Sequence, residues 1–263
     1  HSHELDAQII LSDIMGVTRE FLITNDHLPV SKKIQNSYKN AIKRRMKREP
    51  VAYIIGKKEF WSQKFKVNSA TLVPRPETEL LIYKIVKYFK NKKINILDIG
   101  TGSGCILLSI LTELHLSHGL GIDVSAKAIN TAHENSKNLN LLNRCKFKIY
   151  DINKFNLGKY DLIVSNPPYI PFKDIKNLSK DITNFEPIVA LNGGNDGLDL
   201  IKKVIYKSKE LLKRNGLLAI EIGTKQYIKV SNILAQEGFK EISKEYDYKS
   251  NVRCIISTKV RFF

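Results

Sequence analysis

The stretch LDIGTGSGC, Leu97 to Cys105, constrains the fold of this 263-residue chain more than any other. It joins a short apolar run, INILDI, to a longer apolar run, CILLSILTELH. Three glycines at alternate positions allow a tight turn and a close approach of the backbone to a ligand. A strand, a glycine-rich turn and a helix in this order are typical of the first unit of an open α/β sheet.

The patterns that follow alternate between strand and helix. Such alternation implies a doubly wound sheet with helices on both of its faces. The final two runs, 239–247 and 251–260, predict an antiparallel hairpin at the end of the chain. Apolar runs predict strands at 94–99, 118–124, 145–151, 159–166 and 216–223, and helical spacing predicts helices at 104–115, 126–140, 196–216 and 225–238.

The first third of the chain has a different pattern. Apolar residues recur at helical spacing over 6–16 and 30–48, and Pro50 interrupts the pattern. Residues 58–67 alternate around a short polar centre and predict a β-hairpin, and a helix follows with Pro76 in its first turn. We therefore divide the chain into a helical domain (1–55), a hairpin with a linker helix (56–91) and an α/β domain (92–263).

Acidic residues stand at the ends of three successive predicted strands. Asp98 would repel a pyrophosphate but suits an ammonium or sulfonium group, and no lysine follows the glycines as a P-loop requires. Asp123 can accept both hydroxyls of a ribose, and Asp151 with Ile152 suits an adenine. The set favours S-adenosylmethionine (AdoMet), a positively charged nucleoside, over NAD. Strand-end acids also cap helices, and this alternative is strongest for Asp151.

The fourth predicted strand ends in SNPPYIP, residues 165–171. An amide or exocyclic amine nitrogen is planar and weakly nucleophilic, so its methylation needs acceptors that hold its N–H groups and align its lone pair. Asn166 offers a side-chain carbonyl, Pro167 offers a main-chain carbonyl beside its missing N–H, and Tyr169 offers a flat face. No strong general base is required, because the proton can leave after methyl transfer.

These motifs together resemble those of class I AdoMet-dependent methyltransferases that act on a planar nitrogen. NPPY leaves the substrate open, because DNA-adenine and ribosomal RNA-guanine methyltransferases also carry it. Longer blocks are similar to those of the release factor glutamine methyltransferases, the PrmC/HemK family, and the resemblance covers essentially the whole chain. These blocks are GKKEFWSQKFKV, LVPRPETELLI, FEPIVALNGGNDGLDLIKKVI and LLAIEIGTKQ.

The resemblance implies a Rossmann-like class I methyltransferase fold: a doubly wound, seven-stranded mixed sheet, a small N-terminal helical domain and a connecting β-hairpin. It implies methyl transfer from AdoMet to the side-chain amide N5 of the glutamine in the GGQ motif of peptide chain release factors, modulating translation termination. S-adenosylhomocysteine is then the product, and no metal is used.

The resemblance also assigns site residues. The cofactor residues are Asp98, Gly100, Thr101, Gly102, Ser103, Gly104, Asp123, Asp151, Ile152 and Asn166. Asn166, Pro167 and Tyr169 are the catalytic residues, and the substrate residues are Asn166, Pro167, Pro168, Tyr169, Arg75, Pro76, Glu77 and Thr78. The alternative for residues 75–78 is an ordinary capped helix start between the domains. The family's turn before the last strand is usually acidic or rich in arginine, whereas here only Arg253 stands there.

The high positive charge of the chain favours a second hypothesis for its substrate. The chain carries a formal charge of +17 and has a pI near 9.6, with its densest cluster at Ile42 to Glu49. Such a surface favours RNA, DNA or an acidic protein as partner, although scattered lysines are often only solvated. An rRNA, tRNA or DNA exocyclic-amine methyltransferase is therefore the second hypothesis. A non-catalytic AdoMet- or RNA-binding adaptor would not need an intact Asn166 and glycine turn.

The apolar runs, the N-terminus and the cysteines indicate where in the cell the protein is expected. No apolar run is long enough to span a membrane, and the N-terminus lacks the pattern of a secretory signal. Three widely spaced cysteines favour buried thiols in a reducing cytoplasm. We expect a cytoplasmic monomer with no membrane contact. The abrupt end at KVRFF and the trimmed start leave open a longer polypeptide, and the sequence does not specify which release factor is preferred.

Overall fold

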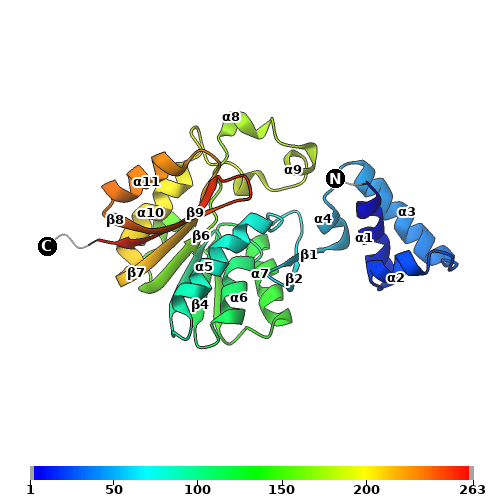
Figure 1. The fold of residues 1–263 in the computed structure, drawn as a ribbon, viewed down its shortest axis with the longest axis horizontal. Helices are drawn as coiled ribbons and strands as arrows, with labels where there is room; N and C mark the ends of the chain where they lie inside the picture. The colour runs from blue at the N-terminus through cyan, green and yellow to red at the C-terminus, as the bar shows by residue number, and fades with distance from the viewer. Residues whose placement is uncertain (1–2, 261–263) are drawn as a thin grey trace.

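The structure is a computed structural model of the chain, and it describes residues 3–260. Residues 1–2 and the last three residues of the KVRFF ending lie outside this range. Helices near the N-terminus gather at one end of the molecule, and the large sheet with its helices occupies the other end (Figure 1). A small hairpin connects the two parts.

Four helices form the N-terminal part: α1 (His3–Met15), α2 (Arg19–Thr24), α3 (Lys32–Met46) and α4 (Val51–Ile55). The predicted helices over 6–16 and 30–48 are confirmed, whereas α2 and α4 were not delimited as separate helices within the predicted helical domain. Gly16 follows α1 in the left-handed region, at a φ of 69°. Helix α3 ends at Met46, before Pro50, and the Pro50 carbonyl accepts the N–H of Tyr53 at 2.9 Å and so begins α4.

The predicted hairpin is confirmed as β1 (Lys57–Phe60) and β2 (Gln63–Lys66), which pair antiparallel. Several side chains fasten it to the large domain, among them Glu79 and Asn135. Glu79 accepts the backbone N–H of Trp61 at 2.8 Å. Asn135 accepts the N–H of the last residue of β2 at 2.7 Å and donates to the Ser103 carbonyl at 2.8 Å. The hairpin is thereby held against the glycine-rich turn.

The large domain contains a seven-stranded sheet in the order β5-β4-β3-β6-β7-β9-β8. Strands β5, β4, β3, β6 and β7 are parallel to one another, and β9 pairs antiparallel with both β7 and β8. This mixed sheet confirms the expected fold and its terminal hairpin. The strands are β3 (Asn95–Ile99), β4 (His118–Asp123), β5 (Cys145–Ile149), β6 (Tyr160–Ser165), β7 (Leu212–Glu221), β8 (Phe239–Tyr246) and β9 (Val252–Lys259).

Helices cover both faces of the sheet (Figure 1). Neighbouring residues of one strand point to opposite faces, so β6 sends Leu162 and Val164 into one core and Ile163 into the other. The first core packs against α5, α6 and α7, and the second packs against α10 and α11. These helices are α5 (Glu79–Phe89), α6 (Cys105–Glu113), α7 (Ala126–Asn138), α10 (Asp199–Leu211) and α11 (Tyr227–Gln236).

The predicted end of one long helix is wrong. Helical spacing predicts a helix over 196–216, but α10 ends at Leu211 and β7 begins at Leu212. Leu212 is 4% exposed and pairs with Tyr160 of β6, and Asn215 takes a φ of 62° before the regular pairing resumes at Leu217. Burial and strand pairing thus override the helical propensity of the polar residues in between.

Short segments complete the chain. One lies within the linker, one follows β5, and three follow the NPPY motif. Only the helix start at Pro76 was predicted. They are η1 (Pro76–Thr78), η2 (Ile152–Lys154), α8 (Phe172–Ile175), α9 (Lys180–Thr183) and η3 (Ile188–Ala190).

Candidate active site

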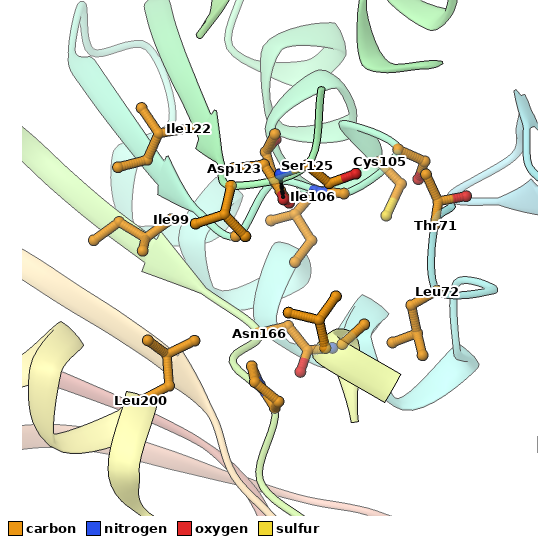
Figure 2. A pocket seen from close by; sticks show the side chains of 18 of the residues that line it. Thr71, Leu72, Ile99, Cys105, Ile106, Ile122, Asp123, Ser125, Asn166 and Leu200 are labelled. Carbon is orange, nitrogen blue, oxygen red and sulfur yellow. Dashed lines mark hydrogen bonds between the residues drawn. The ribbon is translucent and has the colours of Figure 1, made fainter. Parts of the chain in front are cut away.

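A cavity lies at the carboxyl ends of β3, β4 and β6, where side chains from several segments meet. Figure 2 shows Asp123 and Ser125 on one side of this cavity and Asn166 on another. Its walls come from the linker before η1, the glycine-rich turn, the end of β4, the start of η2 and the NPPY motif. We call it the cofactor cavity.

The glycine-rich turn forms the base of this cavity. Gly100, Gly102 and Gly104 all have φ between 55° and 79°, a region that other residues adopt only with strain. At Gly104 a Cβ atom would stand 3.1 Å from Phe147 and 3.2 Å from Ala132, so a side chain there would require these neighbours to shift. Thr101 and Ser103 are buried within the turn, and both line the cavity.

Asp123, the last residue of β4, lines the cavity and braces the turn. Its two oxygens accept the N–H of Gly102 at 3.0 Å and the N–H of Ser125 at 2.9 Å. Burial raises the pKa of this carboxyl, while the backbone hydrogen bonds oppose that rise. A carboxylate offers about four acceptor positions, so each oxygen retains a position for a ligand hydroxyl.

Asp98 lies fully buried behind the turn and does not line the cavity. One of its oxygens accepts the Thr101 hydroxyl at 2.7 Å, and the other has no hydrogen-bond partner among residues 3–260. Burial, with repulsion from Asp123 as a smaller cause, raises the pKa of Asp98 to about 7. Two carboxyl groups at this turn make the surroundings suitable for a cationic ligand.

We expect Asp98→Asn to reveal this burial as a change in stability. The raised pKa means that the folded chain holds a proton on Asp98 between about pH 4 and pH 7, where the unfolded chain has released it. The contribution of Asp98 to the free energy of unfolding therefore falls as the pH rises through this window. The variant should melt at a higher temperature than the wild type near pH 8, with a smaller difference near pH 5. Thermal unfolding at both pH values checks this, and a constant difference would contradict it.

Asp151 and Ile152, which were both assigned to the adenine, differ in the structure, because only Ile152 lines the cofactor cavity. Strand β5 ends at Ile149, so Asp151 does not end the strand as predicted. Its side chain caps η2 by accepting the N–H and the side-chain amide of Asn153, both at 2.8 Å, and it does not line the cavity. Ile152 and its neighbour Tyr150 do line it. The capping alternative therefore describes the Asp151 contacts.

The NPPY motif stands between the cofactor cavity and a second, smaller hollow. Asn166 and Pro168 line both spaces, whereas Pro167 and Tyr169 line only the hollow. Pro171 follows the motif and begins α8. Asn166 is therefore placed where a group entering from the hollow would meet a ligand in the cavity.

The PRPETE residues divide between the site and its surroundings. Arg75 lines both spaces, and Thr78 lines the cofactor cavity. Pro76 and Glu77 are exposed and line neither. Arg75 donates to Glu186 at 2.5 Å, and the other oxygen of Glu186 accepts the Val73 N–H at 3.2 Å. Glu186 is 4% exposed, and this contact joins two sequence blocks that are far apart in the chain.

Three residues around Tyr169 were not predicted as site residues. Arg253 donates to the Tyr169 hydroxyl at 2.8 Å, and this hydroxyl lies 3.3 Å from Glu221, to which it donates. Gln226 donates to the Tyr169 carbonyl at 2.9 Å. Burial raises the pKa of Glu221, while Thr78 and Arg253 oppose the rise. Glu221 and Gln226 belong to the EIGTKQ block, which was the available sequence signal.

Part of the basic cluster at 42–49 is already paired. Arg44 binds both oxygens of Glu49, at 2.8 and 2.5 Å. Arg45 binds Asp6 of α1 and Asp181 of α9, each at 2.8 Å, and its side chain is only 18% exposed. This contact, the Arg45 tie, connects the N-terminal helices to the segment that follows NPPY. Arg48 is exposed and lies 4.0 Å from Asp181, so Lys43 and Lys47 are the exposed cations of this cluster that remain among the described residues.

Residues 3–260 contain no group of three or more histidine, cysteine or acidic side chains placed to hold a metal ion. No helix in this range combines the length and apolar character needed to cross a membrane. Cys105, Cys145 and Cys254 are all free thiols.

Fold and site together define a methyltransferase. Residues 90–259 match a family model described as a methyltransferase domain, and residues 1–56 match one described as the PrmC N-terminal domain. The fold is similar to that of a ribosomal protein L11 methylase from Lactobacillus delbrueckii subsp. bulgaricus. The TM-score is 0.54 at 18% identity, with 72% of this chain and 81% of the other covered.

Relatives with higher identity specify the family. The chain is 37% identical to a release factor glutamine methyltransferase from Caulobacter vibrioides, over 97% of this chain and 89% of that protein. It is 38% identical to the protein of the same name from Clostridium acetobutylicum, over 97% of this chain and 90% of that protein. The chain therefore belongs to the release factor glutamine methyltransferase family.

Proposed function

We propose that this protein transfers a methyl group from AdoMet to the side-chain amide N5 of the glutamine in the GGQ motif of peptide chain release factors. The placement of Asn166 supports this proposal most directly. It lines both the cofactor cavity and the hollow, so its amide can contact a substrate group beside a bound cofactor.

The residues of the cavity fit AdoMet. Its cationic sulfonium supplies an electrophilic methyl group when bound, and the unpartnered Asp98 oxygen with Asp123 favours a positive charge nearby. The Asp123 carboxylate would accept ribose hydroxyls, and Ile152 and Tyr150 would contact the adenine. The turn from Gly100 to Gly104 would lie against the remainder of the cofactor.

The NPPY residues would hold the substrate amide. Its two N–H groups need acceptors, and the Asn166 side-chain carbonyl with the Pro167 main-chain carbonyl can supply them. Tyr169 would lie against the flat amide group. This arrangement fixes the nitrogen lone pair toward the methyl group and limits rotation of the substrate side chain. The proton leaves after transfer, so no strong base is needed.

The proposal also covers the product, the location of the enzyme and the roles of its domains. S-adenosylhomocysteine would be the product, no metal would take part, and the enzyme would act in the cytoplasm as a monomer. Residues 1–55 would form the substrate-recognition domain, 56–91 the linker and 92–263 the methyltransferase domain. The exposed lysines Lys43 and Lys47 are the candidates for a contact with the release factor or with RNA.

We expect purified protein and labelled AdoMet to label a release factor on the glutamine of its GGQ motif, because the hollow beside Asn166 presents acceptors for an amide. Mass spectrometry of the digested release factor would locate the methyl group. A release factor with the GGQ glutamine replaced by alanine is the matched control and should stay unlabelled. Label on ribosomal RNA, transfer RNA or DNA, with none on the release factor, would favour the nucleic-acid alternative instead.

A further inference from the structure

The orientation of the Asn166 amide decides what this side chain offers to a substrate. Its oxygen and nitrogen ends are nearly equal in size, so packing alone hardly distinguishes the two orientations. If the NH₂ end faced the substrate, donors would face the donors of the substrate amide. The proposed reaction therefore requires a contact that holds the NH₂ end away from the substrate.

Thr78 provides that contact. The Asn166 side-chain nitrogen donates to the Thr78 hydroxyl oxygen at 3.2 Å. A hydroxyl can also donate, and in that case it would attract the oxygen end of the amide instead. The direction in which the Thr78 proton points therefore decides which end of Asn166 is bound.

Glu221 fixes that direction. The Thr78 hydroxyl donates to one Glu221 oxygen at 2.6 Å, inside the fully buried end of β7. An ionised carboxylate only accepts hydrogen bonds, so the Thr78 proton must point to Glu221 and its lone pairs remain for the Asn166 NH₂ group. Arg253, 3.6 Å from the other Glu221 oxygen, favours the ionised form.

The same carboxylate orients the other end of the NPPY motif. The second Glu221 oxygen accepts the Tyr169 hydroxyl proton at 3.3 Å, and Arg253 donates to that hydroxyl oxygen at 2.8 Å. Both hydrogen-bonded paths therefore end at Glu221, one from Asn166 through Thr78 and one from Arg253 through Tyr169.

We propose that Thr78 and Glu221 are positioning residues, which turn the Asn166 carbonyl toward the substrate amide and hold the Tyr169 ring in place. The inference rests on the proposed function, because it takes the substrate nitrogen to be an N–H donor. Neither residue needs to touch the reacting atoms. Removing the Thr78 hydroxyl should therefore lower turnover more than it weakens binding of AdoMet or of the release factor.

The test compares the Thr78→Val variant, the Thr78→Ser variant and the wild-type protein of residues 1–263, with a release factor as substrate. We expect Thr78→Val to lower kcat by about tenfold or more, since the Asn166 amide loses the partner that orients it. Thr78→Ser keeps the hydroxyl and should stay within about threefold of the wild type in kcat. The KM for the release factor and the AdoMet dissociation constant, from calorimetry, should change by less than about threefold in both variants.

Thr131→Val is a matched control. The Thr131 hydroxyl is also buried and also accepts from an asparagine, Asn68, at 2.9 Å, but neither residue lines the cavity or the hollow. Loss of this bond should leave kcat within about threefold of the wild type. A fall equal to that of Thr78→Val would show a general effect of losing such a bond and would overturn the proposal.

A second comparison uses Asn166→Ala as background. If Thr78 acts through Asn166, adding Thr78→Val to Asn166→Ala lowers the single-turnover rate no further. A further loss as large as in the wild-type background would overturn the proposal. The wild type itself separates the two hypotheses. A wild type that leaves the release factor unmethylated refutes the proposed function, whereas an active wild type with an unchanged Thr78→Val variant refutes only the positioning role.

Discussion

Asn166→Ala is expected to lower the rate of methyl transfer to the release factor by about 10²–10³-fold, the loss typical for removal of one preorganised polar group from an active site. Asn166 stands at the junction of the cavity and the hollow, and no other side-chain amide lines either space among residues 3–260. Its loss removes an acceptor for the substrate N–H groups. Single-turnover kinetics with saturating AdoMet would measure the change in the chemical step.

The same variant should still bind AdoMet. Asn166 is only one of the residues that line the cavity, beside those of the linker, the glycine-rich turn and the end of β4, so the dissociation constant should rise by no more than about tenfold, the value of one hydrogen bond. Asn40→Ala, on an exposed face of α3, serves as the control for the substitution itself. An unchanged rate of methyl transfer in Asn166→Ala would refute the role given to the NPPY motif.

Asp123→Ala is expected to weaken AdoMet binding by about 10²-fold or more, because hydrogen bonds to a charged group contribute about 1.5–3 kcal/mol each. The substitution removes the proposed acceptor of the ribose hydroxyls. It also removes the anchor of Gly102, whose N–H donates to Asp123 at 3.0 Å. Isothermal titration calorimetry would give the AdoMet dissociation constants of the wild type and of Asp123→Ala directly.

Asp151→Ala provides the comparison for Asp123→Ala. Asp151 caps η2 and does not line the cavity, so its loss should raise the AdoMet dissociation constant by less than about tenfold. Equal losses in the two variants would show that Asp151 contacts the cofactor, as the sequence alone suggested. Thermal unfolding of both proteins would separate a lost contact from a loss of folded protein.

Sequence patterns were sufficient for the parts of the fold that depend on local periodicity and burial. Buried runs such as the one ending at Ser165 predict parallel strands because both of their faces are apolar. The change from helix α10 to strand β7 at Leu212 was not predictable from the sequence. The polar residues after Leu212 are compatible with a helix or a strand, and only pairing with β6 makes them part of a strand. The short helices α8 and α9 have too few residues to show a period.

Within the site, sequence motifs identified residues but not their partners. The glycine turn, Asp123 and Asn166 could be predicted because each stands at the end of a strand in a recognisable motif. The contacts of Arg75 with Glu186 and of Thr78 with Glu221 join residues 111 and 143 positions apart. No local pattern records such pairs, and Asp151 was misplaced because the strand before it ends two residues earlier than its apolar run.

The Arg45 tie has a consequence for dissection of the protein. Asp181 is bound by Arg45, and the next residue, Ile182, lines the hollow beside Tyr169. Through the contact of Arg45 with Asp181, the N-terminal helices therefore support the segment that forms one wall of the hollow. Excising residues 1–56 would leave the Asp181 carboxylate without this cation and the wall without its support. If residues 1–55 form the proposed substrate-recognition domain, we expect the truncated enzyme to lose that surface together with the support of the hollow.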